Sequence, residues 1–165
     1  MEGIKESKDL TEKNLESFPD VFADILNVFI HMGRQKALPA DLYPAPTETA
    51  YAPAGRALRG QLEEDISKYE MRGGRIVTQY LLANQSEVDR GMVLRKASYV
   101  GAAYREQYDG KVPGVFPVVE LVLYWGERSW NAARSIEELT AECRLDIWTE
   151  ALVDNLLSFE VEVIK

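Results

Sequence analysis

The chain has 165 residues, of which 46% are hydrophobic and 28% are charged, and its formal net charge is −8. This is the composition of an ordinary globular domain, and no apolar run approaches the roughly 18 residues that a membrane-spanning helix needs. A single cysteine, Cys143, and a single histidine, His31, exclude an internal disulfide and a zinc site built from those ligands. Any metal is therefore expected to be a hard cation held by carboxylates.

The negative charge is unevenly distributed along the chain. Residues 1–30 carry seven acidic and three basic side chains, and residues 116–165 carry ten acidic and four basic. Residues 54–111 reverse the balance, with ten basic against eight acidic. A net negative charge argues against binding to nucleic acid through the overall charge of the protein. Any contact with nucleic acid is therefore expected in this middle segment. Solvated surface is the alternative interpretation of its small basic excess.

The first predicted element follows a polar N-terminus. Residues 1–10 are expected to be flexible and residues 11–165 to form a single domain; the N-terminus lacks the apolar segment of a secretory signal, which favours the cytoplasm. Ser17-Phe18-Pro19-Asp20 predicts a helix start with Ser17 as N-cap, and apolar residues at spacings of three and four then predict a helix that ends near Gly33. The four prolines in residues 39–53 predict an extended loop, and a strand is expected near residues 51–58.

Two adjacent strands joined by a glycine turn are expected next. Residues 62–70 fit either a helix or a half-buried strand by periodicity. Residues 75–83 are rich in β-branched and aromatic side chains and follow Gly73-Gly74, which predicts a strand. In a strand, residues two apart share a face, so Ala83 and Gln85 are expected on one side and Asn84 on the other.

The remaining elements complete an alternating pattern. We expect a helix over residues 92–108, a strand covered on both faces over residues 117–124, and a helix that begins at the capping box Ser135-Ile136-Glu137-Glu138. Alternation over residues 158–163 predicts a closing strand. This order of elements predicts a mixed α/β sandwich, with a mixed sheet flanked by helices.

The chain resembles the Rpn family of recombination-promoting nucleases, or YhgA-like transposases, within the PD-(D/E)XK superfamily. The resemblance extends over nearly the whole chain, from about Asp9 to Ile164, and supports a strand over residues 62–70. The segments that carry it are Asp20–Asn27, Asp65-Ile66-Ser67-Lys68-Tyr69, Asn84-Gln85-Ser86, Val88-Asp89, Arg95, Tyr99, Ala102–Arg105, Gln107, Pro117–Gly126 and Trp130-Asn131.

This resemblance implies a restriction-endonuclease-like PD-(D/E)XK core in a cytoplasmic, bacterial protein. Asp65 and Gln85 are then the catalytic candidates, and the metal candidates are Asp65 and position 83, where Ala83 replaces the family's glutamate. The implied activity is Mg²⁺-dependent DNA cleavage linked to recombination or mobile elements, weakened by the missing carboxylate. The implied partners are DNA and either a second copy of this chain or a full-length family member. The alternatives are an inactive derivative that binds DNA or protein, and a remnant without activity.

Several site residues have plainer interpretations. Asp65 belongs to an acidic triplet that is often a solvated strand edge, and Gln85 and Asn84 can simply terminate a strand. Glu120, inside an apolar strand, needs a basic partner or a place in the site, where it or Glu87 could replace the missing ligand. His31, Cys143, Asp20 and Asp24 are expected to be structural, the two aspartates serving a helix N-terminus.

Two further expectations concern the site. Glutamate at position 83 is expected to raise metal-dependent cleavage at least tenfold at little cost in folding, because the position is predicted to lie at an open strand end that reaches water. Several arginines of the middle segment are expected to cluster around the Asp65 face, since a protein that reads a phosphate backbone needs nearby cations. The candidates are Arg56, Arg59, Arg72, Arg75, Arg95 and Arg105.

Overall fold

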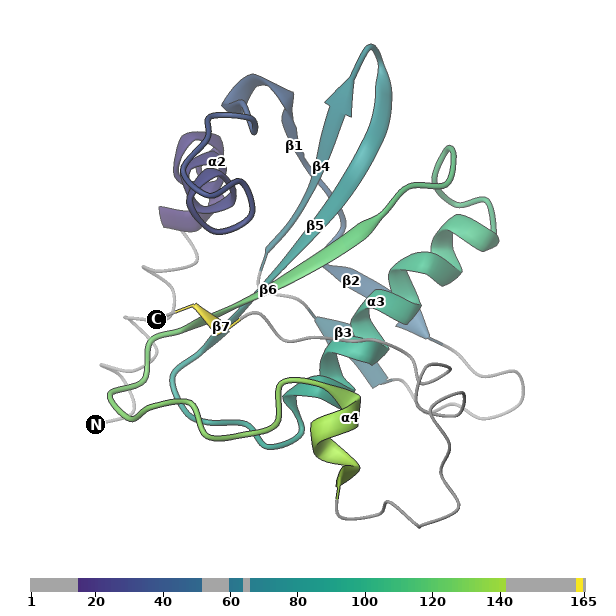
Figure 1. Ribbon diagram of the computed structural model, residues 1–165. Coiled ribbons are helices and arrows are strands. Elements are labelled where there is room, and N and C mark those ends of the chain that lie inside the picture. The colour runs from purple at the N-terminus through teal and green to yellow at the C-terminus, as the bar shows by residue number, and fades with distance from the viewer. Residues whose placement is uncertain (1–14, 52–59, 64–65, 142–162, 165) are drawn as a thin grey trace.

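The structure is a computed structural model that describes residues 15–51, 60–63, 66–141 and 163–164. It is an α/β protein with a five-stranded mixed sheet in the order β1-β4-β5-β6-β7 (Figure 1). The strands are β1 (Leu42–Pro44), β4 (Ile66–Arg72), β5 (Arg75–Gln85), β6 (Val118–Tyr124) and β7 (Val163–Ile164). β4 pairs antiparallel with both β1 and β5, whereas β5, β6 and β7 run parallel. The α/β class predicted from the sequence is confirmed.

Helices cover both faces of the sheet, and Figure 1 shows α2 on one side and α3 on the other. Helix α2 (Pro19–Phe29) packs Phe22, Ala23 and Leu26 against strand residues that include Tyr80 and Leu82. Helix α3 (Met92–Tyr108) connects β5 to β6 and packs on their opposite side, against strand residues that include Leu81, Ala83 and Val122. We call these two sides of the sheet the α2 face and the α3 face. A short helix, α4 (Ile136–Leu139), follows β6.

The segment between α2 and β4 differs from the predicted loop. It forms a 3-10 turn, η1 (Pro39–Asp41), then the edge strand β1, and then strand β2 (Glu48–Tyr51). β2 pairs antiparallel with β3 (Gly60–Glu63) in a separate two-stranded sheet beside α3. Prolines are compatible with short edge strands, because an edge strand leaves some backbone N–H groups unpaired in any case. The strand expected near residues 51–58 lies mostly outside the described residues.

Several predicted boundaries are confirmed and others are corrected. The structure has strands, not a helix, at Gly60–Glu63 and Ile66–Arg72, and α3 has the predicted bounds. Ser135 caps α4 as predicted, its Oγ accepting a hydrogen bond from the Glu138 amide at 3.1 Å. The N-cap of α2 is Phe18 rather than Ser17, and the helix ends at Phe29 before a turn to Gly33. The closing strand is described only as Val163–Ile164.

The turn between β4 and β5 requires both of its glycines. Gly73 and Gly74 have φ of 57° and 76°, and they join Arg72 to its partner Arg75. Positive φ at both central residues is the signature of a type I′ turn, which matches the right-handed twist of the flanking strands. This turn therefore fixes the register of the hairpin that leads into the candidate site.

Gly74→Ala is expected to lower the free energy of unfolding by about 1 kcal/mol, because an alanine Cβ is disfavoured at positive φ. The matched control is Gly101→Ala in α3, where an added Cβ meets no atom within 4 Å; it should stabilise the protein by up to about 1 kcal/mol. Urea denaturation of both variants measures the difference. Equal effects of the two substitutions would contradict the turn assignment.

Candidate functional site

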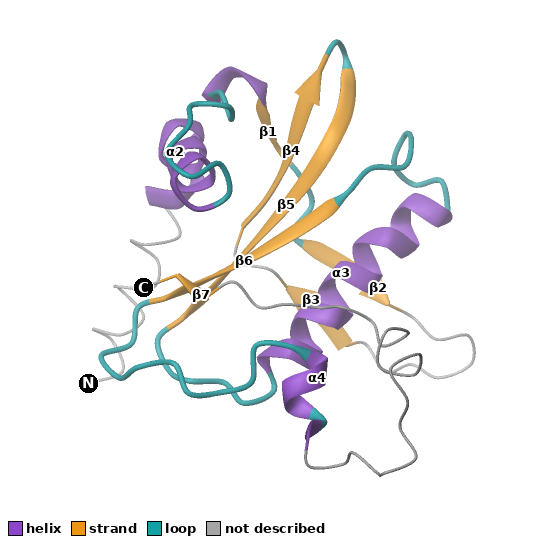
Figure 2. Ribbon diagram, viewed as in Figure 1, coloured by secondary structure: helices purple, strands orange, loops and turns teal. Residues whose placement is uncertain are grey.

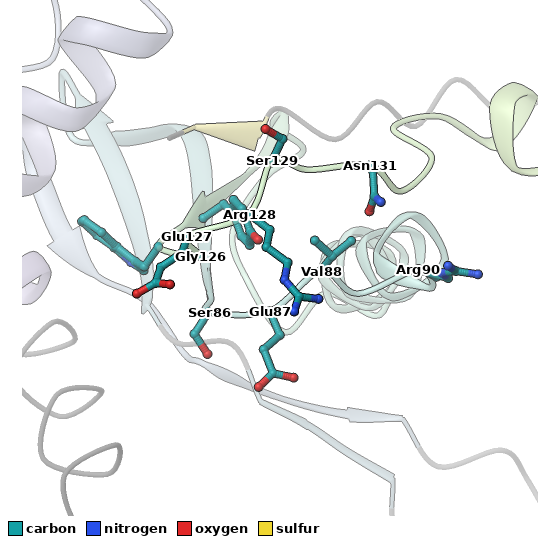
Figure 3. Close-up of a pocket in the computed structure, with 11 residues that line it drawn as sticks. Ser86, Glu87, Val88, Arg90, Gly126, Glu127, Arg128, Ser129 and Asn131 are labelled. Carbon is teal, nitrogen blue, oxygen red and sulfur yellow. The ribbon is translucent and has the colours of Figure 1, made fainter.

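A polar cleft lies at the carboxyl ends of the parallel strands β5 and β6. Figure 2 shows the loops after these strands running beside one another at one end of the sheet. Between them is a cavity of about 770 Å³, and Figure 3 shows the Arg128 side chain extending from the β6 loop toward the β5 loop. The carboxyl end of an α/β sheet is where ligands of such folds usually bind. The cleft is lined by Ser86, Glu87, Val88, Arg90, Tyr124, Trp125, Gly126, Glu127, Arg128, Ser129 and Asn131.

The Asn84 side chain forms hydrogen bonds both to Glu16, near the N-terminus, and to Trp125, in the loop after β6. Its Nδ2 donates to Glu16 Oε2 at 2.7 Å, and its Oδ1 accepts from Trp125 Nε1 at 2.7 Å. Gly126 follows, and a Cβ there would lie 2.2 Å from the Tyr124 ring, so only glycine fits beside that ring. The alternation in β5 places Asn84 on the α2 face, opposite to Ala83 and Gln85, as predicted.

Gln85 is the last residue of β5 and stands next to the cleft. It is half-buried, its Cα partner is Tyr124, and its main-chain oxygen accepts from the Trp125 amide at 2.8 Å. Ser86, the next residue, lines the cleft. Gln85 therefore directly precedes the cleft lining in the chain, although it is not itself one of the lining residues.

Position 83 does not lie at an open strand end. Ala83 is 2% exposed and belongs to an apolar cluster with Met92, Val93 and Val122, each of them fully buried. The expectation that a side chain at position 83 reaches water is wrong. The first turn of α3 covers this position, and a strand pattern alone does not show which residues of a following helix pack onto it.

Glu120 is the buried carboxylate that the sequence marked as unusual. It is 2% exposed, and neither carboxylate oxygen has a hydrogen-bond partner within the described part of the chain. The Lys96 ammonium, on α3, donates to the main-chain oxygen of Glu120 at 3.0 Å. Burial, only partly offset by the positive charges of Lys96 and Arg95, raises the pKa of Glu120 to about 7. Glu120 thus has cationic neighbours but no direct hydrogen bond in residues 15–51, 60–63, 66–141 and 163–164.

The predicted arginine cluster does not form among the described residues. Arg72 lies at the hairpin end of the sheet, where it donates to Glu70 Oε1 at 2.6 Å and to the Lys36 main-chain oxygen at 2.8 Å. Arg95, on α3, donates to Asp89 Oδ2 at 2.9 Å. These arginines belong to different faces and ends of the sheet. The cleft arginines, Arg90 and Arg128, were not among those predicted; they lie in the loops that follow β5 and β6.

The other predicted residues are distributed as follows. Asp65 and Cys143 lie outside the described residues, as do Arg56 and Arg59. Asp20 is in the first turn of α2, and both it and Asp24 are exposed. Glu87 lines the cleft. No group of three or more His, Cys, Asp or Glu side chains suited to a metal ion occurs within the described ranges.

A second buried carboxylate, Glu70, lies on the α2 face and is fully satisfied. Its Oε1 accepts from Arg72, and its Oε2 accepts from the Tyr80 hydroxyl at 2.8 Å. Burial, together with the hydrogen bond to Glu70, raises the pKa of the Tyr80 phenol above its usual value. The contrast with Glu120 is direct, because two carboxylates of similar burial have opposite hydrogen-bonding states.

The fold and the cleft define an α/β protein with a polar site at the carboxyl ends of two parallel strands. The model of the family described as "Putative transposase, YhgA-like" matches residues 65–165, more than half of the chain. The chain belongs to this family. Comparisons with curated proteins and with solved structures return no match. Within the described residues, no helix combines the length and the apolar character needed to cross a bilayer.

Proposed function

We propose that this protein acts on DNA as a metal-dependent endonuclease scaffold of the PD-(D/E)XK type, with Asp65 and Gln85 in the catalytic positions. The observation that carries the proposal is the polar cleft at the carboxyl ends of β5 and β6, whose lining begins at Ser86 directly after Gln85, within a chain of the transposase family. The order of elements supports it: helix α2, the antiparallel strands β1, β4 and β5, helix α3, and the parallel strand β6.

The role proposed for Asp65 comes from the family resemblance, and the described part of β4 begins at the next residue. Ile66, the residue after Asp65, has Leu82 as its Cα partner. Asp65 would be the carboxylate that holds Mg²⁺, and the bound cation would supply polarisation of the phosphoryl oxygens and acidification of the attacking water. Gln85 would orient the phosphate or the water through its amide.

The donor chemistry of the α3 face is compatible with a hard cation. Ala83 offers no ligand atom, but the Glu120 carboxylate on the same face has two oxygens without hydrogen-bond partners in the described residues. Oxygen ligands of this kind are those that Mg²⁺ prefers. The second candidate function is a derivative that binds DNA without cleaving it, and the burial of Ala83 among apolar side chains favours it.

DNA binding is expected to depend on the arginines of the cleft. Arg90→Ala/Arg128→Ala should weaken the binding of a DNA duplex five- to tenfold at low salt, because it removes two cations that can contact phosphates. Each such contact contributes about one unit to the slope of the logarithm of the binding constant against the logarithm of the salt concentration. The charge-matched control is Arg34→Ala/Arg75→Ala, which removes two exposed arginines away from the cleft. Fluorescence anisotropy over a salt series measures both pairs.

The control pair should leave the affinity within twofold of the unmodified protein. Equal losses in the two double variants would mean that the cleft is not the contact surface. Undetectable binding of the unmodified protein at low salt would overturn the DNA-directed function altogether.

A further inference from the structure

A second cavity lies on the α2 face, at the hairpin end of the sheet. It has a volume of about 620 Å³ and is bordered by the loop after α2 and by strands β4 and β5. It is separate from the polar cleft, because the two are lined by different residues. Four of the side chains that line it carry hydrogen-bond donors, and two of these are cations: His31, Gln35, Lys36 and Arg72.

The Arg72 side chain is held in place from two sides. Its Nε and Nη2 donate to Glu70 Oε1 at 2.8 Å and 2.6 Å, and Nη2 also donates to the Lys36 main-chain oxygen at 2.8 Å. Glu70 is held in turn by the Tyr80 hydroxyl. Nη1 of Arg72 has no partner among the described residues, and the side chain is 52% exposed. An arginine fixed in this way loses little conformational entropy when its free end binds a ligand.

The loop that carries Lys36 is fixed as well. Asn27, a buried residue of α2, donates from Nδ2 to the Ala37 main-chain oxygen at 2.9 Å. Its Oδ1 accepts from the amides of Lys36 and Ala37, each at 2.8 Å. The side chains of His31, Gln35 and Lys36 form no hydrogen bond or ion pair within the described part of the chain. Their donors are therefore free for a ligand, on a backbone that is already ordered.

The lining is suited to an anion. Of the described residues, Glu70 alone contributes a carboxylate to it, and both of its oxygens already accept hydrogen bonds from Arg72 and Tyr80. Arginine and lysine donors bind carboxylates and phosphates. A phosphate group offers more oxygens than a carboxylate, which matches donors on four side chains. Leu38 and Val77 add apolar surface for the organic part of such a ligand.

We propose that this cavity binds the phosphate group of a phosphorylated compound, with Arg72 and Lys36 as its charged donors. Glu70 is the residue that positions Arg72. The inference is independent of the proposed function, because it uses no residue of the cleft. A small organic phosphate and the 5′-terminal phosphate of a nucleic acid share this chemistry, and the experiment separates them.

The test uses His31 as a reporter, because it is the single histidine of the chain. The full-length protein is titrated with inorganic phosphate at constant pH and constant ionic strength, and the imidazole C–H resonances are followed by proton NMR. A saturable shift is expected. Lys36→Gln should weaken phosphate binding at least fivefold, and Arg72→Lys should weaken it by a similar factor, because lysine keeps the charge but lacks the planar fork of donors.

The matched control is Arg75→Gln, which removes an exposed arginine that faces Arg72 across the turn but does not line the cavity. It should stay within twofold of the unmodified protein. Equal weakening by Lys36→Gln and Arg75→Gln would mean that phosphate responds only to the general positive charge of this end, and would overturn the inference. Unmodified protein whose His31 resonances show no saturable shift would overturn it as well. If Arg72→Lys does not fold, Lys36→Gln decides alone.

A second titration identifies the source of the phosphate group. A 5′-phosphorylated oligonucleotide and its 5′-hydroxyl counterpart are each added to the protein, and the same resonances are followed. A preference for the phosphorylated form that Lys36→Gln abolishes supports a site for a nucleic-acid terminus. Equal responses to the two oligonucleotides, with inorganic phosphate still bound in a Lys36-dependent way, support a site for a small phosphorylated compound.

Discussion

Replacing Ala83 with glutamate is expected to destabilise the folded protein by about 3 kcal/mol. The Ala83 methyl group is packed against Met92, Val93 and Val122, none of which can pair with a carboxylate. The larger side chain must also displace these residues, because cores have little free volume. Urea denaturation at pH 7 measures the loss.

The matched control is the same substitution at an exposed alanine, Ala40→Glu in η1. It should change the free energy of unfolding by less than about 0.5 kcal/mol, as surface substitutions usually do. Similar stability of the two variants would show that position 83 is open to water. The tenfold gain in cleavage predicted for Ala83→Glu must therefore be measured per folded molecule, because part of the variant is expected to unfold.

The second large effect concerns the pH dependence of stability. In metal-free buffer, Glu120 should cost about 3 kcal/mol of stability at pH 7.5 relative to pH 4, since its pKa rises from 4.5 to about 7 on folding and each unit is worth about 1.4 kcal/mol. Below pH 4.5 both states are protonated and the cost is absent. Between pH 4.5 and 7 the unfolded chain releases its proton while the folded protein retains it, so stability falls as pH rises.

The charged groups that face Glu120 are Lys96 and Arg95 of α3, and both already lower its pKa from the value that burial alone would give. Other titrating groups contribute to the profile of the whole protein, so the measurement is the difference between the unmodified protein and Glu120→Gln. That difference should grow from pH 4.5 to pH 7 and then level off. A difference that is constant over this range would mean that Glu120 is paired in the folded protein.

The sequence predicted the elements whose signals are local. The glycine pair at positions 73 and 74 identified the hairpin, and the apolar run before Tyr124 identified β6. The edge strand β1 was missed because it is held by backbone pairing with β4, which leaves no pattern in its own three side chains. The predicted N-cap of α2, Ser17, was wrong by one residue. Pro19 fits the first helical position, and Phe18 has the extended backbone of an N-cap.

The site was less predictable than the fold. Gln85 was predicted as a site residue from the family resemblance, and its catalytic role stays a prediction. Glu120 was singled out for its isolation among apolar residues, and the structure shows it buried. The burial of Ala83 was not predicted, because it depends on Met92 and Val93 packing across the sheet from a later helix. Arg128 and Trp125 were missed as site residues, because the cleft arises only when the loops after two parallel strands meet.

The most direct test of the DNA endonuclease scaffold is the nicking of supercoiled plasmid by the full-length protein with Mn²⁺, compared with Asp65→Ala under the same conditions. We expect slow nicking that EDTA abolishes and that Asp65→Ala lacks, because Asp65 is the carboxylate that holds the cation in this account. Nicking that persists undiminished in Asp65→Ala would contradict the account and locate the chemistry elsewhere. Absence of nicking by the unmodified protein, with duplex binding intact, would contradict the endonuclease activity and favour the derivative that only binds DNA.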